Sequence, residues 1–390
     1  MTDRIEHIQV FVFERQRDEN YLGEVAKGEQ AIGDHHVVRH FNGTIYPRQD
    51  RSVVLKLTDA DGVVGWGETY GLVAPKTILA IIEDLIGPYL KTLDCSDPAK
   101  VWDALYDLQR VRGYWGGYLA DALAAIDIAL WDIHARKCGK SLQAVLGKPG
   151  AYKLHGYVSG LPQKTRAGRI EEALRWKGLG FDSIKIPVSA TDDGDVVGEF
   201  AALREALGDD HRIALDLHWA FSVSEVTEMD QDLEPYNPWF LEAPVKPEDI
   251  QAQVAVGRSI KAPLALGEEW RSEWDYIPRV GACSIVQPEM GHTGVTQFMR
   301  MAKRAVKASS RLIPHATIGL GIFMSASLRA SVAAGAESHE FQHTIFGRNA
   351  ELLDGATACQ SGAFEIPDTL GHGVTPNADG LAHLTELVFL

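Results

Sequence analysis

The sequence has few cysteines and no long apolar or basic segment. Its four cysteines, Cys95, Cys138, Cys283 and Cys359, are far apart and form no Cys-x-x-Cys pair. This spacing argues against a zinc site or a disulfide framework and is typical of a reducing cytoplasm, where we expect the protein. No uninterrupted apolar stretch is long enough to cross a bilayer, so we expect no membrane partner. Residues 1–20 are charged from the start and lack the apolar segment of a signal peptide.

The chain is acidic, with a formal net charge of −15 over 390 residues. An acidic surface repels nucleic acids and anionic membranes, so we expect neither as a partner. A small anionic substrate is still compatible with this charge, because a few local cations can outweigh the global field. Hydrophobic residues make up 45% of the chain, enough for a sizeable core. The length suits a small domain joined to a barrel-sized one.

The first 150 residues combine strand patterns with helical ones. Residues 5–14 alternate between apolar and polar side chains, and residues 52–70 contain two strand patterns around an Asp-Gly turn. The segment 16–48 lacks clear periodicity and predicts a long loop. This order predicts an α+β domain over residues 1–150. Helical patterns lie at 76–93, 98–110 and 117–140.

From residue 151 onward, short strand patterns alternate with helical ones. Eight strands with helices between them predict a (β/α)8 barrel over residues 151–359. The last segment, 360–390, does not continue the alternation, and we expect it to complete the first domain. The strand patterns lie at 153–158, 182–187, 212–217, 238–243, 263–268, 284–289, 311–316 and 337–342.

Three consecutive predicted barrel strands end in an acidic residue. Asp216, Glu242 and Glu268 are separated by 26 residues at each step, which is one strand–helix unit. Catalytic groups of such barrels sit at the C-terminal ends of the strands, so the three carboxylates should converge. Converging carboxylates repel unless a cation lies among them, and all-oxygen ligands suit Mg²⁺. The alternative, three unrelated solvated strand ends, does not explain the common phase.

Short motifs follow one another in a specific order along nearly the whole chain. They include VVGWGE at 63–68, AAIDIALWDIHARKCGKSLQAVLG at 124–147, GFDSIKIP, LDLHWAFS, FLEAPV, LGEEW, VQPEMGHTGVT, IPHATIG and HEFQ. In order and spacing they resemble the enolase superfamily, and within it the mandelate racemase subgroup. The resemblance implies a modified (β/α)8 barrel under an N-terminal α+β capping domain. It also implies Mg²⁺ on the three acids, with a Lys or His base whose enediolate product the metal stabilises.

His315, in LIPHAT, and Glu289, in VQPEM, resemble the histidine–acid pair of this subgroup. The usual acid is Asp, so Glu289 is a conservative departure. A carboxylate bonded to an imidazole orients it and raises its pKa, which makes it a better base. The alternative is a structural histidine, but position and partner together favour His315 as the residue that removes a proton.

Lys185, in SIKIP, matches the first lysine of the Lys-x-Lys motif of many family members. The second position is Pro187, which has no proton-carrying group. A two-base racemisation through this strand is therefore disfavoured. Lys185 remains a candidate catalytic residue that binds the substrate carboxylate or tunes the charge of the site, and an exposed strand-end lysine is the alternative.

His218 follows Asp216 by two residues, which puts both side chains on one side of a strand. The Asp-x-His pattern resembles that of sugar-acid dehydratases, in which this histidine can protonate the departing hydroxide. Hydrogen bonding around the metal is the alternative. The resemblance gives Glu340, in HEFQ, a protonated carboxyl that bonds the substrate carboxylate, and this role requires a raised pKa. A simple strand-end acid is the alternative for Glu340.

The segment 16–48 resembles the family's capping loop, which closes over the barrel and reads the distal end of the substrate. Its cations and polar donors suit a polyhydroxylated or dianionic acid, and Arg17, His40 and Tyr46 are our candidate substrate contacts. The alternative is a solvated loop. Trp270, just beyond Glu268, is a fourth candidate that would wall the pocket, although aromatic residues are more often part of the core.

The sequence thus predicts a Mg²⁺-dependent acid-sugar dehydratase, a hydro-lyase that forms a 2-keto-3-deoxy acid from an aldarate such as galactarate. The second hypothesis is an isomerase, either a racemase or epimerase or a lactone cycloisomerase, acting through the same enediolate. It would need a proton donor on the other face, for which Lys185 is the candidate. A third hypothesis, a barrel that binds ligand without turnover, is disfavoured by the intact acid set. Relatives often form symmetric oligomers, so we expect a homo-oligomer.

Overall fold

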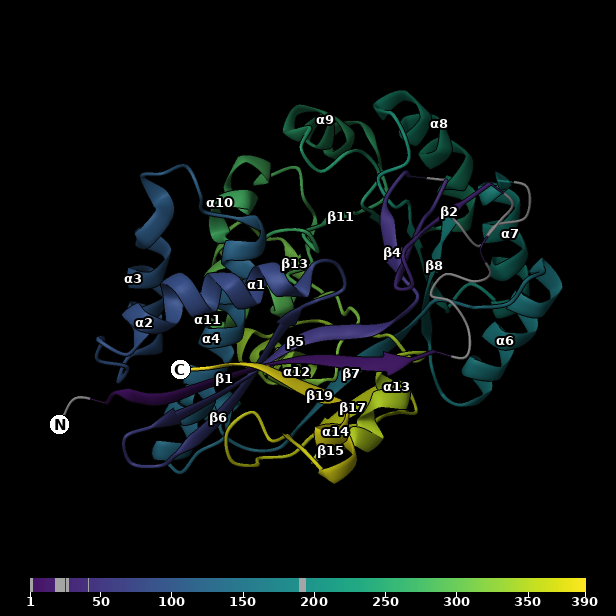
Figure 1. Ribbon diagram of the computed structural model, residues 1–390. Helices are drawn as coiled ribbons and strands as arrows, with labels where there is room; N and C mark the ends of the chain where they lie inside the picture. Colours follow the sequence, from purple (N-terminus) through teal and green to yellow (C-terminus); the bar gives the residue numbers. More distant parts are fainter. Residues whose placement is uncertain (1–2, 18–24, 26–27, 41, 189–193) are drawn as a thin grey trace.

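The structure is a computed structural model, which describes residues 3–17, 25, 28–40, 42–188 and 194–390. The N-terminal part of the chain forms an antiparallel sheet, here called the capping sheet (Figure 1). The sheet has the strand order β19-β1-β5-β6. The predicted Asp-Gly turn between β5 and β6 is confirmed, because Oδ1 of Asp59 accepts the backbone N–H groups of Asp61 and Val63 at 3.0 and 2.8 Å. The strands are β1 (Ile5–Gln16), β5 (Gln49–Asp59), β6 (Val64–Tyr70) and β19 (Leu384–Phe389).

Helices pack on this sheet and confirm the α+β class predicted for this region. The long helix α4 lies so close to β6 that only glycine fits on the strand at the contact. A Cβ atom at Gly67 would lie 1.9 Å from the carbonyl oxygen of Ala125 in α4, and one at Gly65 would lie 2.3 Å from that of Ala129. The helical elements are α1 (Pro75–Ile81), the π-helical turn η1 (Ile82–Ile86), α2 (Gly87–Leu90), α3 (Pro98–Arg110) and α4 (Gly117–Lys137).

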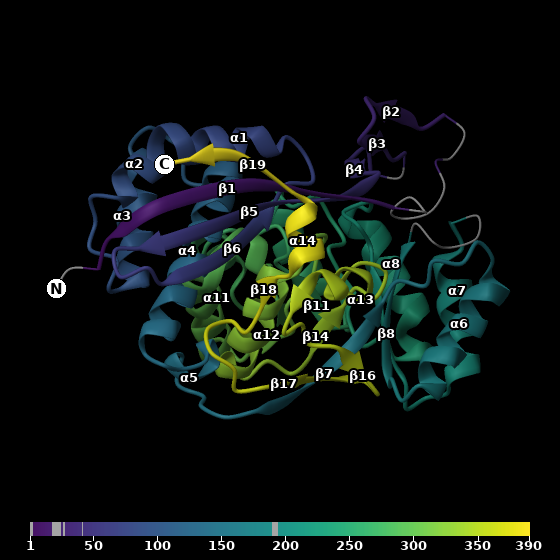
Figure 2. The same cartoon turned by 60° about the horizontal axis from the view of Figure 1, so that its bottom comes forward.

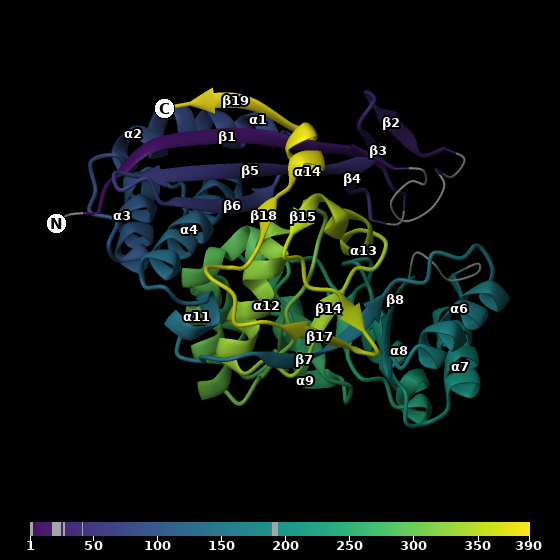
Figure 3. The ribbon, with the colours of Figure 1, turned by 90° about the horizontal axis from the view of Figure 1, so that it is seen from below.

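Eight parallel strands form the predicted barrel, which lies below the capping sheet in the view of Figure 3. The eighth strand, β14, pairs with the first, β7, and backbone hydrogen bonds from Glu337 to Leu312 and from Glu340 to Pro314 close the circle. A separate buried cluster that includes Tyr157, Phe240 and Ile313 fills its interior. The strands are β7 (Tyr152–Ser159), β8 (Ser183–Pro187), β9 (Arg212–Asp216), β10 (Leu241–Glu242), β11 (Leu264–Leu266), β12 (Ile285–Val286), β13 (Arg311–Leu312) and β14 (His339–Phe341).

Several barrel strands are shorter than their sequence patterns. The pattern at 238–243 yields only β10, because Ala243 has a positive φ of 45° that turns the chain out of the sheet. The connecting helical elements are α5 (Leu142–Val145), α6 (Arg166–Gly178), α7 (Val196–Leu207), α8 (Val223–Leu233), η4 (Glu234–Tyr236), α9 (Ile250–Ser259), α10 (Glu273–Tyr276), η5 (Ile277–Arg279), α11 (Met290–Lys307) and α12 (Ile322–Ala334).

The segment predicted as a long loop, 16–48, contains a small antiparallel sheet instead. Its three strands are β2 (Gln30–Ile32), β3 (His36–Val38) and β4 (Ile45–Pro47). Each is three residues long, too short for apolar alternation to be visible in the sequence. Residues 18–24, 26–27 and 41 of this segment lie outside the described residues.

The C-terminal segment returns to both units. Strand β19 pairs with β1 in the capping sheet (Figure 2), as expected. Strand β17, however, pairs with β7 of the barrel (Figure 3), so the boundaries at 150 and 360 stay a prediction. No helix among the described residues is long and apolar enough to cross a membrane. The remaining elements are α13 (Phe346–Asn349), η6 (Ala350–Leu352), β15 (Leu353–Asp354), β16 (Cys359–Gln360), β17 (Ala363–Ile366), β18 (Thr375–Pro376) and α14 (Ala378–Ala382).

Candidate active site

The three acids of the predicted metal site lie at the C-terminal mouth of the barrel. Asp216 ends β9 and Glu242 ends β10, and the parallel register places these two residues side by side. Glu268 follows the end of β11 by two residues. Burial disfavours a charged carboxylate, so each acid requires a partner of opposite charge or a hydrogen-bond donor.

His218 is the partner of Asp216. Its Nε2 atom lies 2.9 Å from Oδ2 of Asp216, and its backbone N–H donates to Oδ1 at 3.0 Å. Burial acts to raise the pKa of Asp216, but the His218 imidazole outweighs it and lowers that pKa to about 2. The predicted proximity of Asp216 and His218 is therefore present, but the two residues do not share one strand as expected. Strand β9 ends at Asp216, and His218 follows in a left-handed turn with φ 46°.

Lys185 lies between two other acids of the mouth. Its Nζ atom pairs with Oε1 of Glu242 and lies 3.1 Å from Oε1 of Glu340. Burial opposes the ammonium charge, but these two carboxylates outweigh it and raise the pKa of Lys185 well above its ordinary value. Lys185 is therefore a buried cation, which fits an electrostatic role better than that of a proton acceptor.

Glu340 differs from what the resemblance implies. Its side chain is fully buried, and its Oε2 atom accepts the backbone N–H of Ala316 at 3.0 Å. Burial acts to raise the pKa of Glu340, but Lys185 and His315 outweigh it and lower that pKa. This direction is opposite to the raised pKa that the resemblance implies, because two basic groups face the carboxylate, and the protonated carboxyl of Glu340 stays a prediction.

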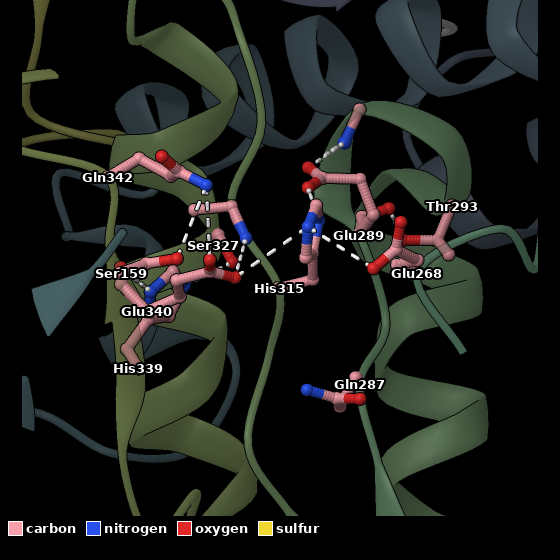
Figure 4. A network of polar contacts seen from close by, with 12 residues as sticks. Ser159, Glu268, Gln287, Glu289, Thr293, His315, Ser327, His339, Glu340 and Gln342 are labelled. Carbon is pink, nitrogen blue, oxygen red and sulfur yellow. Dashed lines mark hydrogen bonds and ion pairs between the residues drawn. The ribbon is translucent and has the colours of Figure 1, made fainter. Parts of the chain in front are cut away.

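His315 occupies the centre of the acid cluster (Figure 4). Its Nδ1 atom lies 2.9 Å from Oε2 of Glu289, whose other oxygen accepts the N–H of Gly291 at 3.1 Å at the start of α11. Its Nε2 atom lies 3.4 Å from Glu268 and 3.7 Å from Glu340. Burial acts to lower the pKa of His315, but the three carboxylates outweigh it and raise that pKa to about 10. The predicted histidine–acid contact is therefore present.

Glu242, Glu268 and His315 each offer one ligand atom within 4.8 Å of the others, which is close enough to hold a metal ion. Oε2 of Glu268 is buried and finds no hydrogen-bond partner among the described residues. Burial, helped by the charges of Asp216 and Glu242, raises the pKa of Glu268 well above its usual value. A divalent cation would relieve this unfavourable arrangement, and a set of carboxylate oxygens suits Mg²⁺. Glu242 and Glu268 thus fit the predicted metal, whereas Asp216 is not part of this group and pairs with His218, so its role as a ligand stays a prediction.

The hydroxyl of Tyr46, in the small capping sheet, accepts a hydrogen bond of 3.0 Å from Asn42, and its role as a substrate contact stays a prediction. Burial, together with the charges of Asp216 and Glu268, raises the pKa of its phenol. Trp270 does not reach these acids. Only 2% of its surface is exposed, and its ring stacks on Tyr276 within the hydrophobic core. This packing fits the structural alternative that the sequence left open for Trp270.

The other two predicted substrate contacts have protein partners. Arg17 forms an ion pair of 2.6 Å with Asp50, and both side chains are buried. His40 is exposed, and its Nε2 atom lies 2.7 Å from the carbonyl oxygen of Gly28. The structure therefore brings neither side chain to the acid cluster.

Two polar residues of the mouth were missed. Gln287 donates a hydrogen bond of 2.5 Å to Oε2 of Glu242, and Gln342 donates one of 3.2 Å to Oε1 of Glu340. Each lies two residues from a predicted site residue at a strand end, Gln287 before Glu289 and Gln342 after Glu340. Period-two alternation could have identified both.

The chain matches two family descriptions in succession. They are "Mandelate racemase / muconate lactonizing enzyme, N-terminal domain" over residues 41–147 and "Enolase C-terminal domain-like" over residues 168–380. The chain belongs to the enolase superfamily, within its mandelate racemase subgroup. A crystal structure of an enolase superfamily member from Agrobacterium tumefaciens is 44% identical, with a TM-score of 0.95, and covers 99% of this chain and 100% of its own.

Characterised members of the superfamily are also similar to this chain. The D-galactonate dehydratase of Klebsiella pneumoniae is 33% identical over 78% of this chain and 82% of its own length. The D-galactarolactone cycloisomerase of Agrobacterium fabrum is 29% identical over 84% of this chain and 90% of its own length. These relatives support dehydratase or isomerase activity in the superfamily member described here.

Proposed function

We propose that this superfamily member is a Mg²⁺-dependent acid-sugar dehydratase. The observation that carries the proposal is the orientation of His315, which Glu289 binds at Nδ1 while Nε2 faces the acid cluster. A base held in this way can remove a proton from the carbon beside a carboxylate if the developing charge is stabilised. The buried cation Lys185 and the candidate metal site lie where that charge would develop.

Each of the residues at the barrel mouth has its own role in the proposed reaction. Asp216, Glu242 and Glu268 would hold Mg²⁺, which when bound supplies positive charge to the enediolate oxygens. A cation held by Glu268 would offset the charge that most raises the pKa of His315, and Nε2 of His315 then accepts the α-proton. The electron pair left on the α-carbon forms a double bond to the β-carbon as the β-hydroxyl leaves. The hydroxyl takes a proton from His218 or from His315 itself, so water is released. The enol then tautomerises to the 2-keto-3-deoxy acid.

We propose an aldarate such as galactarate as the substrate. The polar donors of the capping segment suit a substrate with hydroxyl or carboxylate groups at both ends, and the charges of Asp216 and Glu268 act on Tyr46 of that segment. The similarity to D-galactonate dehydratase supports a sugar acid. We further propose a cytoplasmic homo-oligomer. The four cysteines are free, which is compatible with a reducing compartment.

The second candidate is an isomerase, and the similarity to D-galactarolactone cycloisomerase favours it. Such a reaction returns a proton to the enediolate instead of expelling hydroxide. Lys185 is the obvious second proton donor, but Glu242 and Glu340 raise its pKa well above the ordinary value, so its ammonium is a weak acid that holds its proton. Pro187 removes the other lysine of the motif. Both observations support the dehydratase over the isomerase.

The test is a screen of the purified protein with Mg²⁺ against aldaric, aldonic and uronic acids, with a carbonyl reagent to detect 2-keto acids. We expect a product that is lost with EDTA and in His315→Asn. His155→Asn is the matched control. His155 also pairs with a carboxylate, that of Asp182 at 2.6 Å, but it lies on β7, far in sequence from His315 and Glu289. Deuterium incorporation from D₂O without formation of a keto acid would replace the dehydratase with an isomerase.

A further inference from the structure

The end of strand β6 contacts the two loops that carry His315 and Glu289. Glu68, the first contact residue, belongs to the capping sheet and is fully buried. Its carboxylate accepts the backbone N–H groups of Gly321, Ile322 and Phe323 at 3.0, 2.7 and 3.2 Å, and also that of Leu320. These groups lie between the His315 segment and the first turn of α12. A buried carboxylate at a helix N-terminus satisfies amides that would otherwise lack partners.

The next two residues of β6 contact the other loop. The hydroxyl of Thr69 donates a hydrogen bond of 2.5 Å to the carbonyl oxygen of Gly291. The ring of Tyr70 stacks on that of His292, with 3.7 Å between ring centroids and 20° between planes. Gly291 and His292 follow Glu289 by two and three residues, and the N–H of Gly291 donates to the Glu289 carboxylate. Strand β6 therefore also contacts the segment that carries Glu289, the acid of the His315–Glu289 pair.

Tyr70 links the two loops. Its hydroxyl lies near the side chain of Thr317, two residues beyond His315, which acts to lower the pKa of the phenol, while its ring contacts His292 on the Glu289 side. The strand itself has little freedom to move, since Gly67 is pressed against the backbone of α4. Three successive side chains on a fixed strand thus contact both segments whose relative position sets the His315–Glu289 distance.

We propose that Glu68 and Tyr70 are positioning residues for the His315–Glu289 pair. Neither has a part in the proton transfer itself. Glu68 fixes the chain after His315, and Tyr70 fixes the chain after Glu289 relative to it. This inference deepens the proposed function, because it takes His315 as the base. A displacement of about 1 Å in a catalytic group can cost about 100-fold in rate, so small movements of these loops matter.

The primary test compares Glu68→Gln with the unaltered protein by downfield proton NMR and by kinetics. The Nδ1 proton shared between His315 and Glu289 gives a resonance that is assigned by its loss in His315→Asn. We expect Glu68→Gln to shift or broaden this resonance, and to lower kcat by about 10- to 100-fold with KM changed less than about twofold. The NMR readout needs no substrate. A changed resonance in a protein without dehydratase activity would leave the positioning role standing and reject only the function.

Asp230→Asn is the matched control. Asp230 is also a buried carboxylate that accepts two backbone N–H groups, those of Lys261 and Ala262, but it lies on α8 on the outside of the barrel. The Asp230→Asn substitution should leave both the His315–Glu289 resonance and kcat unchanged. If Glu68→Gln does not fold, Tyr70→Phe, which keeps the ring on His292 but removes the hydroxyl near Thr317, provides the second variant, with a smaller shift and a smaller loss of kcat expected. An unaltered resonance in a folded Glu68→Gln or Tyr70→Phe protein would overturn the inference.

Discussion

Nζ of Lys185 lies 3.1 Å from Oε1 of Glu340, and the same ammonium group pairs with Glu242. One buried cation thus joins an acid of the candidate metal site to the acid that faces His315. The three groups come from β8, β10 and β14, so this contact also ties distant strands of the barrel together at the mouth.

Lys185→Met should destabilise the folded protein, because it leaves two buried carboxylates without their cation. Removal of one partner of a buried ion pair costs about 3–5 kcal/mol. Urea unfolding in EDTA measures this loss, and Mg²⁺ should restore more stability to the variant than to the unaltered protein. Lys261→Met is the control. Lys261 pairs with Glu234 at the surface, where an ion pair contributes about 1 kcal/mol or less. Equal losses in the two variants would contradict the prediction.

Glu289→Gln should lower kcat by about 10²- to 10⁴-fold with little change in KM. The amide keeps the shape of the side chain but not the charge that stabilises the protonated imidazole. Steady-state kinetics on the substrate found in the screen provide the measurement. Glu337→Gln serves as the control, since Glu337 pairs with Arg311 at the other end of β13. Retention of more than half the activity in Glu289→Gln would remove Glu289 from the proposed mechanism.

Asp127 should make the protein less stable as the pH rises from about 4 to about 7. Its buried carboxylate accepts hydrogen bonds from the N–H and hydroxyl of Thr296, yet burial outweighs them and raises its pKa to about 7. The folded state therefore keeps a proton that the unfolded state loses near pH 4, and the stability from this group disappears as the pH passes the folded pKa.

The variant Asp127→Asn tests the direction in which Asp127 changes the stability of the protein as the pH rises. The free energy of unfolding of the variant, relative to that of the unaltered protein, should rise by roughly 3 kcal/mol between pH 5 and pH 8. Urea titrations at several pH values give the comparison. Parallel pH profiles for the two proteins would show that Asp127 is ionised throughout this range in the folded state.

Gly67→Ala should destabilise the protein by about 1–3 kcal/mol or more, because its Cβ would lie 1.9 Å from a backbone oxygen of α4. Gly178→Ala is the control. Gly178 ends α6 with no atom within 4 Å of the added carbon, so alanine should be neutral or stabilise by up to about 1 kcal/mol. Thermal unfolding of both variants measures the difference. A Gly67→Ala protein as stable as the unaltered one would show that β6 can move on α4.

Much of the candidate site could be predicted from the sequence, because it depends on strand ends. Asp216, Glu242 and Glu268 share one phase of the barrel repeat, and the parallel register then brings their ends to one mouth. The pairing of His315 with Glu289 followed from the resemblance, and the structure places the two side chains in contact. The small sheet of the capping segment was not predicted, since strands of three residues carry too little periodicity.

The ionisation of the site could not be read from the sequence. The resemblance implies a protonated Glu340 with a raised pKa, whereas the basic groups of Lys185 and His315 lower the pKa of this carboxyl. These groups come from strands far apart in the chain, and the balance between burial and charge depends on distances of a few ångströms. Trp270 was likewise placed only by packing, since its neighbour Glu268 is at the mouth while its own ring lies in the core.

By itself, the sequence determined the order of the elements, the barrel class and the three acids, because periodicity and spacing are local properties that survive without coordinates. Only the tertiary structure decided which charged groups of the site lie close enough to neutralise one another. It also decided that strand β6 of the capping sheet contacts the loops that follow His315 and Glu289. The side chain of Glu68 and the amides it binds are separated by more than 250 residues, and no local pattern encodes a contact across that distance.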